Sequence, residues 1–352
     1  ASTQCQPTGT DFWFVGAASG IGERAVLVLT NPESATATVD VTFHGLKGIV
    51  DAADARGVQV RPRTSAQLRL DRLAAGEKVL AVHVQVRVGR LSAAITETDV
   101  FGFEPRGTDW IPQASTPQTE VVVPGVPPVN QGRESKVRLD IVAPDEAAVV
   151  TISLITPEGS FTPQGADVVD VPAGGVASVD LTEAMRGDAA AISLTSDVPI
   201  TAGARVELKN PDIFGDLLYL AAAGPLDAPA VVPDNRTSAD LQTRLILTAP
   251  ESAATAVVTG FAGGQEWTAG RVELAPGTTQ VVTVRPPRGQ GERGDSYGLV
   301  VTPGGAGPLY GVRMLDEEGP RGPLVTSFPL TTARLLAQVP EAFPDIAVGT
   351  MD

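Results

Sequence analysis

Histidine and cysteine, which often serve as catalytic bases and nucleophiles, are few in this 352-residue chain, whereas carboxylates are many. It holds two histidines, His44 and His83, and one cysteine, Cys5, against 41 Asp and Glu residues. A Ser-His-Asp triad needs one of these histidines as its base. His44 stands at the end of an alternating apolar segment, and His83 lies inside another, out of phase with its valines. We therefore predict that both histidines lie on the surface or between domains and that neither is catalytic.

The segment Gly16–Gly22, GAASGIG, resembles the glycine-rich turn of dinucleotide-binding folds. That turn joins a strand to a helix whose N-terminus holds a pyrophosphate. The residues that follow here, ERAVLVLTNP, instead alternate as a strand does and stop at Pro32. Ser19 also lacks the G-x-S-x-G spacing of a nucleophile elbow. The sequence therefore predicts a loop between two strands and no cofactor.

Metal binding and carboxylate catalysis have no clear sequence pattern either. Two histidines and one cysteine are too few for a typical zinc site. The acids at Asp316–Glu318 and at Asp51 and Asp54 lack the spacing of a calcium loop, and we interpret them as solvated turns. Asp11 and Asp109 share a Gly-Thr-Asp-aromatic pattern, which we interpret as a turn signature. We predict no catalytic, cofactor-binding or metal-binding residue.

Recognition of carbohydrate needs exposed aromatic rings, on which the apolar face of a sugar stacks. The chain has three Trp residues. Trp13 and Trp110 lie in strand-like segments and are interpreted as core, whereas Trp267 stands in the glycine-rich segment Gly263–Gly270. Trp267 is therefore the candidate glycan contact.

The elements that would position these residues occur three times along the chain. Each copy has an alternating apolar run, a proline stop, an acidic turn and a second apolar run: Val26–Phe43, Val137–Leu154 and Arg244–Phe261. The stops at Pro32, Pro144 and Pro250 are 112 and 106 residues apart. This period is too long for a solenoid repeat and suits a whole small domain.

Short strands with turn residues between them are predicted throughout each copy. In the first copy they are Asp11–Gly16, Ala25–Thr30, Thr38–Phe43, Val58–Val60, Gln67–Leu70, Val79–Val86 and Leu91–Thr96. The last two apolar runs of each copy look like a closing hairpin, and the pattern is typical of an immunoglobulin-like sandwich. We predict an all-β chain of three tandem immunoglobulin-like β-sandwich domains, at residues 9–116, 117–229 and 230–340, with a tail at 341–352.

Proline-rich joints connect these copies at Pro112–Pro117 and Gly224–Pro229. Such joints are short and stiff, so we expect a rigid row of domains. One helix is predicted at Thr331–Val339, where it would cap the third domain.

Charge and composition exclude several classes of partner. The formal net charge of −15 opposes binding to nucleic acid or to an anionic membrane surface. The single cysteine, Cys5, excludes a disulfide within the chain. No apolar run is long enough to cross a bilayer, so we predict no membrane insertion by this segment. The polar stretch from Ala1 is typical of what remains after a leader or N-terminal anchor is removed, which favours an extracytoplasmic location.

Several motifs carry a resemblance to a known family: GTDFWFVG, the LTNP stop, VVVPGVPP and the proline-centred turn before VDL. They resemble secreted or membrane-tethered actinobacterial proteins of unknown function with tandem β-sandwich repeats. The resemblance covers the whole chain, and the Arg-, Ala- and Gly-rich composition is that of a GC-rich bacterium. It implies fold, location and bacterial class, and it implies no active site.

Two functions fit these observations, and a third stays open. The first is a non-catalytic extracytoplasmic scaffold or interaction module with a protein partner in the bacterial cell envelope. The second is a glycan-binding module for cell-wall or surface polysaccharide, with Trp267 as its contact. A carboxylate-dependent hydrolase is the third, and it would require two acids facing each other across a cleft.

Overall fold

The computed structural model describes residues 7–102, 104–128, 134–185, 187–210, 213–287, 296–319 and 322–332. These residues lie almost entirely in strands, which confirms the all-β prediction. Alternating side chains explain the strands: in β2 (Glu23–Asn31) and β3 (Ala37–Gly45), buried residues alternate with half-exposed ones. The loop predicted at Gly16–Gly22 is confirmed, since residues 18–22 join the end of β1 (Asp11–Ala17) to β2.

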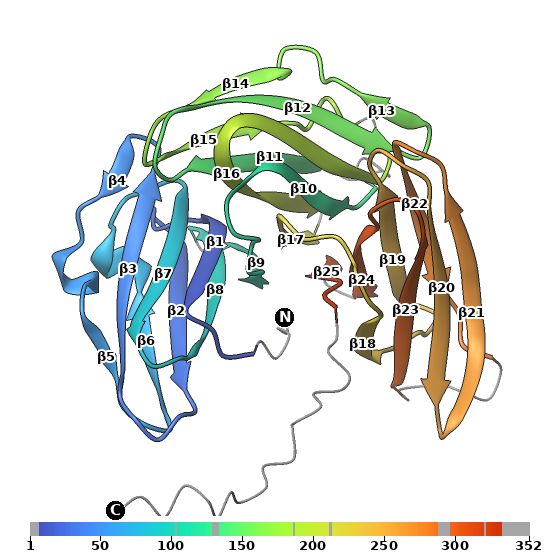
Figure 1. Ribbon diagram of the computed structural model, residues 1–352, viewed down its shortest axis with the longest axis horizontal. Coiled ribbons are helices and arrows are strands. Elements are labelled where there is room, and N and C mark those ends of the chain that lie inside the picture. The colour runs from blue at the N-terminus through green and yellow to red at the C-terminus, as the bar shows by residue number, and fades with distance from the viewer. Residues whose placement is uncertain are drawn as a thin grey trace, which may run out of the picture.

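The first repeat forms two facing sheets (Figure 1). One sheet has the order β1-β7-β3-β4, with β5 also paired to β3, and the other has the order β6-β2-β8-β9. Its further strands are β4 (Gly48–Val50), β5 (Val58–Val60), β6 (Thr64–Arg69), β7 (Leu80–Val88), β8 (Ser92–Phe101) and β9 (Glu104–Ile111). The short helices η1 (Ala53–Ala55) and α1 (Leu70–Leu73) lie in the connections.

The second repeat is held together by one long strand. Its elements are β10 (Gln118–Val126), β11 (Glu134–Ala143), β12 (Ala148–Thr156), β13 (Gly159–Phe161), β14 (Val168–Val171), β15 (Gly175–Asp180), β16 (Ala190–Asn210) and β17 (Ile213–Ala221). The first half of β16 pairs with β10 and β12, and its second half pairs with β11 and β17. The 21 residues of β16 therefore belong to both sheets of this repeat.

The third repeat has the same strand order as the first. Its strands are β18 (Ala230–Asn235), β19 (Leu241–Ala249), β20 (Ala254–Ala262), β21 (Gln265–Leu274), β22 (Thr278–Val284), β23 (Tyr297–Gly305), β24 (Tyr310–Gly319) and β25 (Gly322–Pro329). They pair in the orders β18-β23-β20-β21 and β22-β19-β24-β25. Equivalent pairings thus occur three times, although the independence of the domains at the predicted boundaries stays a prediction.

The closing hairpin predicted for each repeat is wrong. β7 pairs with β1 and β3, whereas β8 pairs with β2 and β9 in the opposite sheet. β23 and β24 are separated in the same way, and in the second repeat the crossing is the continuous β16. Two adjacent apolar runs look alike whether they turn back within a sheet or cross between sheets. Compared with an immunoglobulin sandwich, the β2–β6 and β3–β7 pairs are kept, while β1 and β8 have exchanged sheets.

The three sandwiches form an arch (Figure 1). The last strand of each repeat, β9, β17 and β25, lies on the inner side of the arch, and β17 contacts both of the others. The proline-rich joints take part in this packing. Ala114 of the first joint forms a bridge with Trp13, and the backbone N–H of Leu226 in the second joint donates to the carbonyl oxygen of Leu309 at 2.8 Å.

Apolar side chains cross between the first and second repeats. Trp13 and Val15 on one face of β1 belong to the core of the second repeat, whereas Phe12 on the other face belongs to the first. In return, Leu217 and Tyr219 of β17 pack in the core of the first repeat. This exchange fixes the two sandwiches against each other.

Some predictions concern residues outside the described part of the chain. Cys5, the tail at 341–352 and most of the helix predicted at Thr331–Val339 lie there. Thr331 and Thr332 are described and are not helical, and Thr332 forms a bridge with Ala230. Within the described ranges, no helix combines the length and apolar character that crossing a membrane requires.

Candidate functional site

A cleft of about 960 Å³ opens where the third repeat meets β9 and β17. This volume lies in the range of clefts that bind ligands or peptide segments. The apolar lining residues are Pro105, Leu241, Leu315, Pro323, Leu324 and Val325. The charged lining residues are Asp216, Asp234, Arg236 and Glu317. The cleft therefore combines an apolar surface with an excess of carboxylates.

Two buried carboxylates hold one wall of the cleft, the edge strand β25. Asp216 Oδ2 of β17 accepts a hydrogen bond from the backbone N–H of Val325 at 2.9 Å. Asp109 Oδ1 of β9 accepts one from Thr326 Oγ1 at 3.1 Å. A strand at the edge of a sheet has unpaired backbone groups, so such contacts fix its position. The turn interpretation of Asp109 is thus wrong, because Asp109 lies inside a strand and links two repeats.

Burial raises the pKa of both carboxyl groups. Asp109 is 1% exposed, and desolvation raises its pKa to about 7, with the nearby charge of Asp216 acting in the same direction. Desolvation also raises the pKa of Asp216, against the backbone N–H groups of Val325 and Leu217. Asp109 Oδ2 has no hydrogen-bond partner among the described residues. Asp109 does not line the cleft, so these two acids do not face each other across it.

Gly107 allows β17 to lie close to β9. Its φ of +142° is unfavourable for other residues, and a Cβ there would be 2.7 Å from Asp216 Oδ1 and 2.8 Å from the backbone nitrogen of Leu217. A side chain at Gly107 would therefore push the two strands apart and displace Asp216.

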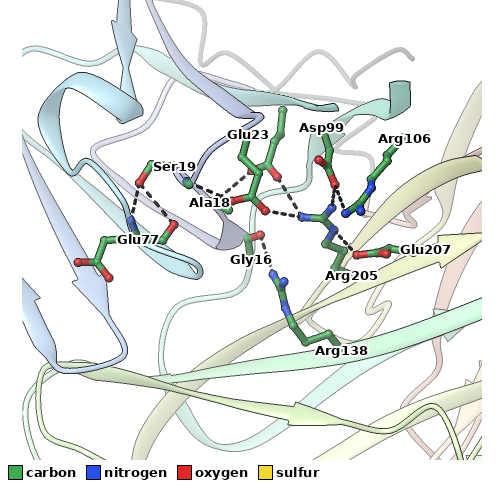
Figure 2. Close-up of polar contacts among 12 residues, drawn as sticks. Gly16, Ala18, Ser19, Glu23, Glu77, Asp99, Arg106, Arg138, Arg205 and Glu207 are labelled. Carbon is green, nitrogen blue, oxygen red and sulfur yellow. Dashed lines mark hydrogen bonds and ion pairs between the residues drawn. The ribbon is translucent and has the colours of Figure 1, made fainter. Parts of the chain in front are cut away.

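Farther from the cleft, Arg205 of β16 links the second repeat to the first (Figure 2). It is 2% exposed, and its guanidinium lies among three carboxylates of the first repeat and one of its own strand: Glu23, Glu97, Asp99 and Glu207. The Nη1 atom is 3.3 Å from Glu97 Oε1 and 3.5 Å from Glu23 Oε1. Removing the cation alone would leave these carboxylates buried without a partner, so the two repeats are joined by charges that depend on each other.

Glu97 is the centre of this cluster. Its carboxylate accepts hydrogen bonds from the backbone N–H of Ala18 at 2.8 Å and from Tyr219 Oη at 2.6 Å. Burial raises its pKa to about 7, although Arg205 and Tyr219 act to lower it. Beside it, Arg138 pairs with Asp140 and donates to the carbonyl oxygen of Gly16 at 3.3 Å, another contact between the two repeats (Figure 2).

Both histidines lie beside Trp13. His44 is buried, and its Nδ1 is 3.0 Å from the carbonyl oxygen of Gly174 in the second repeat, so the predicted position between domains is confirmed. His83 stacks on Trp13 with ring centroids 3.9 Å apart, and its Nε2 is 2.9 Å from Asp11 Oδ2. The hydroxyl of Ser19 is used in local backbone contacts, since it donates to the carbonyl of Ala74 and accepts from the backbone N–H of Glu77.

The acids at Asp316–Glu318 lie inside β24, so their interpretation as a solvated turn is wrong. Neighbouring side chains of a strand point to opposite faces. Asp316 pairs with Arg244 at 3.3 Å, and Glu317 lines the cleft. Within the described ranges, no three His, Cys, Asp or Glu side chains are grouped so that they could hold a metal ion.

Trp267 lies in β21 and not in the glycine-rich turn that the sequence indicated. Its ring is half-buried against the core of the third repeat, directly over Gly260 and 5.9 Å from the ring of Tyr297. Trp267 does not line the cleft, and a glycan contact there stays a prediction.

The sequence did contain a signal for the buried acids of the first repeat. In β8 the inward-facing positions alternate along the strand, and they are occupied first by Ala93 and Ile95 and then by Glu97 and Asp99. An acid at an inward position of a strand needs a buried partner. The partner Arg205 is more than a hundred residues away, and the register that brings it there depends on how the repeats pack.

The comparison with protein families finds one family, and its function is unknown. Residues 1–285 match a family of unknown function, DUF5719. The chain belongs to this family. The match covers the first two repeats and ends next to β22 of the third, and it confirms the predicted membership of a family of unknown function. No curated protein matches the chain.

Proposed function

We propose that this DUF5719 protein is a non-catalytic scaffold of the bacterial cell envelope that holds a protein partner in the cleft between its repeats. The observation that carries this proposal is the cleft itself, with walls from β9, β17, β18, β19, β24 and β25 fixed by buried contacts. A preformed site loses little conformational entropy when it binds, which favours affinity.

The lining of the cleft supports a protein partner. Leu324 is 54% exposed and lies beside Pro323, so an apolar side chain of a partner has a surface to cover. Asp234 and Glu317 supply charge, and Arg236 is already 3.4 Å from Asp234. Interfaces commonly combine an apolar centre with a polar rim.

The buried acids support a role without catalysis. Glu97 and Asp109 have the most raised carboxyl pKa values, and both are at most 1% exposed. Each is used in a contact between repeats, where no substrate reaches it. The extracytoplasmic location is proposed on the resemblance of the sequence motifs to those of secreted or membrane-tethered proteins.

The test is site-specific photo-crosslinking in an envelope extract of the source bacterium. A photoreactive residue at Leu324 should capture one protein, and the same residue at Phe261, an exposed position outside the cleft, should not. Capture should also be lost when Glu317→Lys is added to the Leu324 probe. Polysaccharide captured in place of protein, released by free sugar and lost on Trp267→Ala, would establish the glycan-binding alternative.

A further inference from the structure

Arg313 of β24 is a buried cation that no carboxylate of the described residues neutralises. It is 6% exposed, and its Nε and Nη1 atoms are buried without a hydrogen bond. It forms no ion pair with any residue of the described ranges. Its guanidinium carbon lies 4.6 Å from the ring centroid of Phe328. A cation–π contact replaces only part of the hydration that a guanidinium loses on burial.

The other two repeats have aliphatic residues at this position. The proline stops align Leu27, Leu139 and Leu245, and these pair with Ile95, Ala204 and Arg313, respectively. The neighbouring strand then contributes Ile111, Leu220 and Phe328. All these residues except Arg313 are buried and apolar. The sandwich therefore forms without a charge at this position.

Arg205 shows how this chain buries an arginine for structural purposes. It is buried to a similar degree, and carboxylates surround it. Among the described residues nothing comparable accompanies Arg313, whose pKa burial lowers to about 10 although Asp234 and Tyr297 act to raise it. Among the described residues, the guanidinium of Arg313 therefore has a nearby carboxylate but none in direct contact.

Arg313 lies close in the fold to residues that line the cleft. Alternate residues of a strand share a face, so Arg313 lies on the same face of β24 as Leu315 and Glu317, which line the cleft. Asp234, whose charge acts on Arg313, lines the cleft as well. Arg313 is therefore next to the wall of the cleft, within the third sandwich.

We propose that the guanidinium of Arg313 receives the carboxylate of an organic acid whose apolar part lies in the cleft. The planar fork of a guanidinium matches a carboxylate through two parallel hydrogen bonds. The apolar part would contact Leu241 and Leu315. The carboxylates of the lining oppose a doubly charged phosphate more strongly than a single carboxylate. This site does not depend on the proposed scaffold role, since a protein partner could use the cleft without an acid.

Thermal unfolding and calorimetry of the full chain test this assignment, with sodium hexanoate as the probe and sodium chloride and sodium phosphate at equal ionic strength as comparisons. Hexanoate should raise the melting temperature in a saturable manner by several degrees. Arg313→Met should weaken hexanoate binding by at least about tenfold. It should also raise the melting temperature of the free protein, because methionine fills similar space without an unpaired charge.

The matched control is Arg244→Met, on the neighbouring strand, which removes an arginine already paired with Asp316 and should leave the hexanoate response intact. If Arg313→Met does not fold, Arg313→Ile, which inserts the residue of the first repeat, serves in its place. The assignment fails if hexanoate gives no saturable shift, or if the Arg313 variant keeps it. A phosphate response as large as that of hexanoate would also overturn it.

Discussion

Asp109 shows how burial can shift the protonation of a residue. Its pKa is about 7 in the folded chain, compared with 3.8 for the free carboxyl. Between these pH values the folded state keeps a proton that the unfolded state releases. The free energy of unfolding therefore falls as pH rises from about 4 to about 7, and the loss is complete above that range. The cost of burying Asp109 is thus greatest under alkaline conditions, where its carboxyl group is ionised, although Thr326 then donates to a stronger acceptor.

The variant Asp109→Asn tests this pH dependence. The amide keeps the shape and can still accept from Thr326, but it never ionises. We expect the variant to be more stable than wild type at pH 8 by about 1–3 kcal/mol and close to wild type at pH 4.5. Urea unfolding at several pH values measures this, with Asp54→Asn on an exposed residue as the control. A variant that is less stable at pH 8 would show that the ionised carboxylate is needed.

Arg205 and Arg313 should respond in opposite ways to the same substitution. Arg205→Met leaves Glu97 and Asp99 buried without their cation, so we expect a loss of about 3–5 kcal/mol in the free energy of unfolding. Arg87→Met, which breaks an exposed pair with Asp40, should change it by less than about 1 kcal/mol. Urea unfolding measures both free energies. Equal losses for Arg205→Met and Arg87→Met would mean that the buried cluster stabilises the fold no more than a surface ion pair does.

At the scale of elements, β17 packs between β9 of the first repeat and β25 of the third, so its position affects both. Gly107→Ala should force β9 and β17 apart and lower the melting temperature by several degrees. Gly102→Ala is the matched control, since Gly102 also has a positive φ, +62°, but a Cβ there would have no atom of the described residues within 4 Å. Thermal unfolding compares the two variants. An equal decrease in their melting temperatures would mean that Gly107→Ala acts through backbone strain alone and not through contact with β17.

The strands themselves are predictable from the sequence, and their arrangement is not. Alternation in DFWFVG correctly places Phe12 and Trp13 on opposite faces, since a strand has a period of two residues. The same alternation does not report which sheet a strand joins, so it predicts a hairpin where the chain crosses from β7 to β8. The contact of Asp109 with Thr326 spans 217 residues, and no local pattern contains it.

At the scale of the whole molecule, the first two repeats complete each other. Trp13 and Val15 fill the second core, and Leu217 and Tyr219 fill the first. An interface between ordinary domains leaves each core closed, and relative motion is then expected. Here, separating the repeats would open both cores and expose the charges around Arg205. The first two repeats are thus expected to move as one rigid body, and Asp216 and Asp109 hold β25 of the third repeat against them.

Truncation tests this interdependence directly. A fragment of residues 1–117 keeps the first predicted domain but lacks Leu217 and Tyr219, and it exposes Trp13, which is 4% exposed in the full chain. We expect this fragment to be poorly folded, with weak NMR dispersion and rapid proteolysis, whereas residues 1–229 should fold cooperatively because both exchanged sets are present. If residues 1–117 instead fold with the stability that they have in the full chain, the predicted boundary separates independent domains. The rigidity of the arch would then depend on its surface contacts alone, and the cleft would open and close with them.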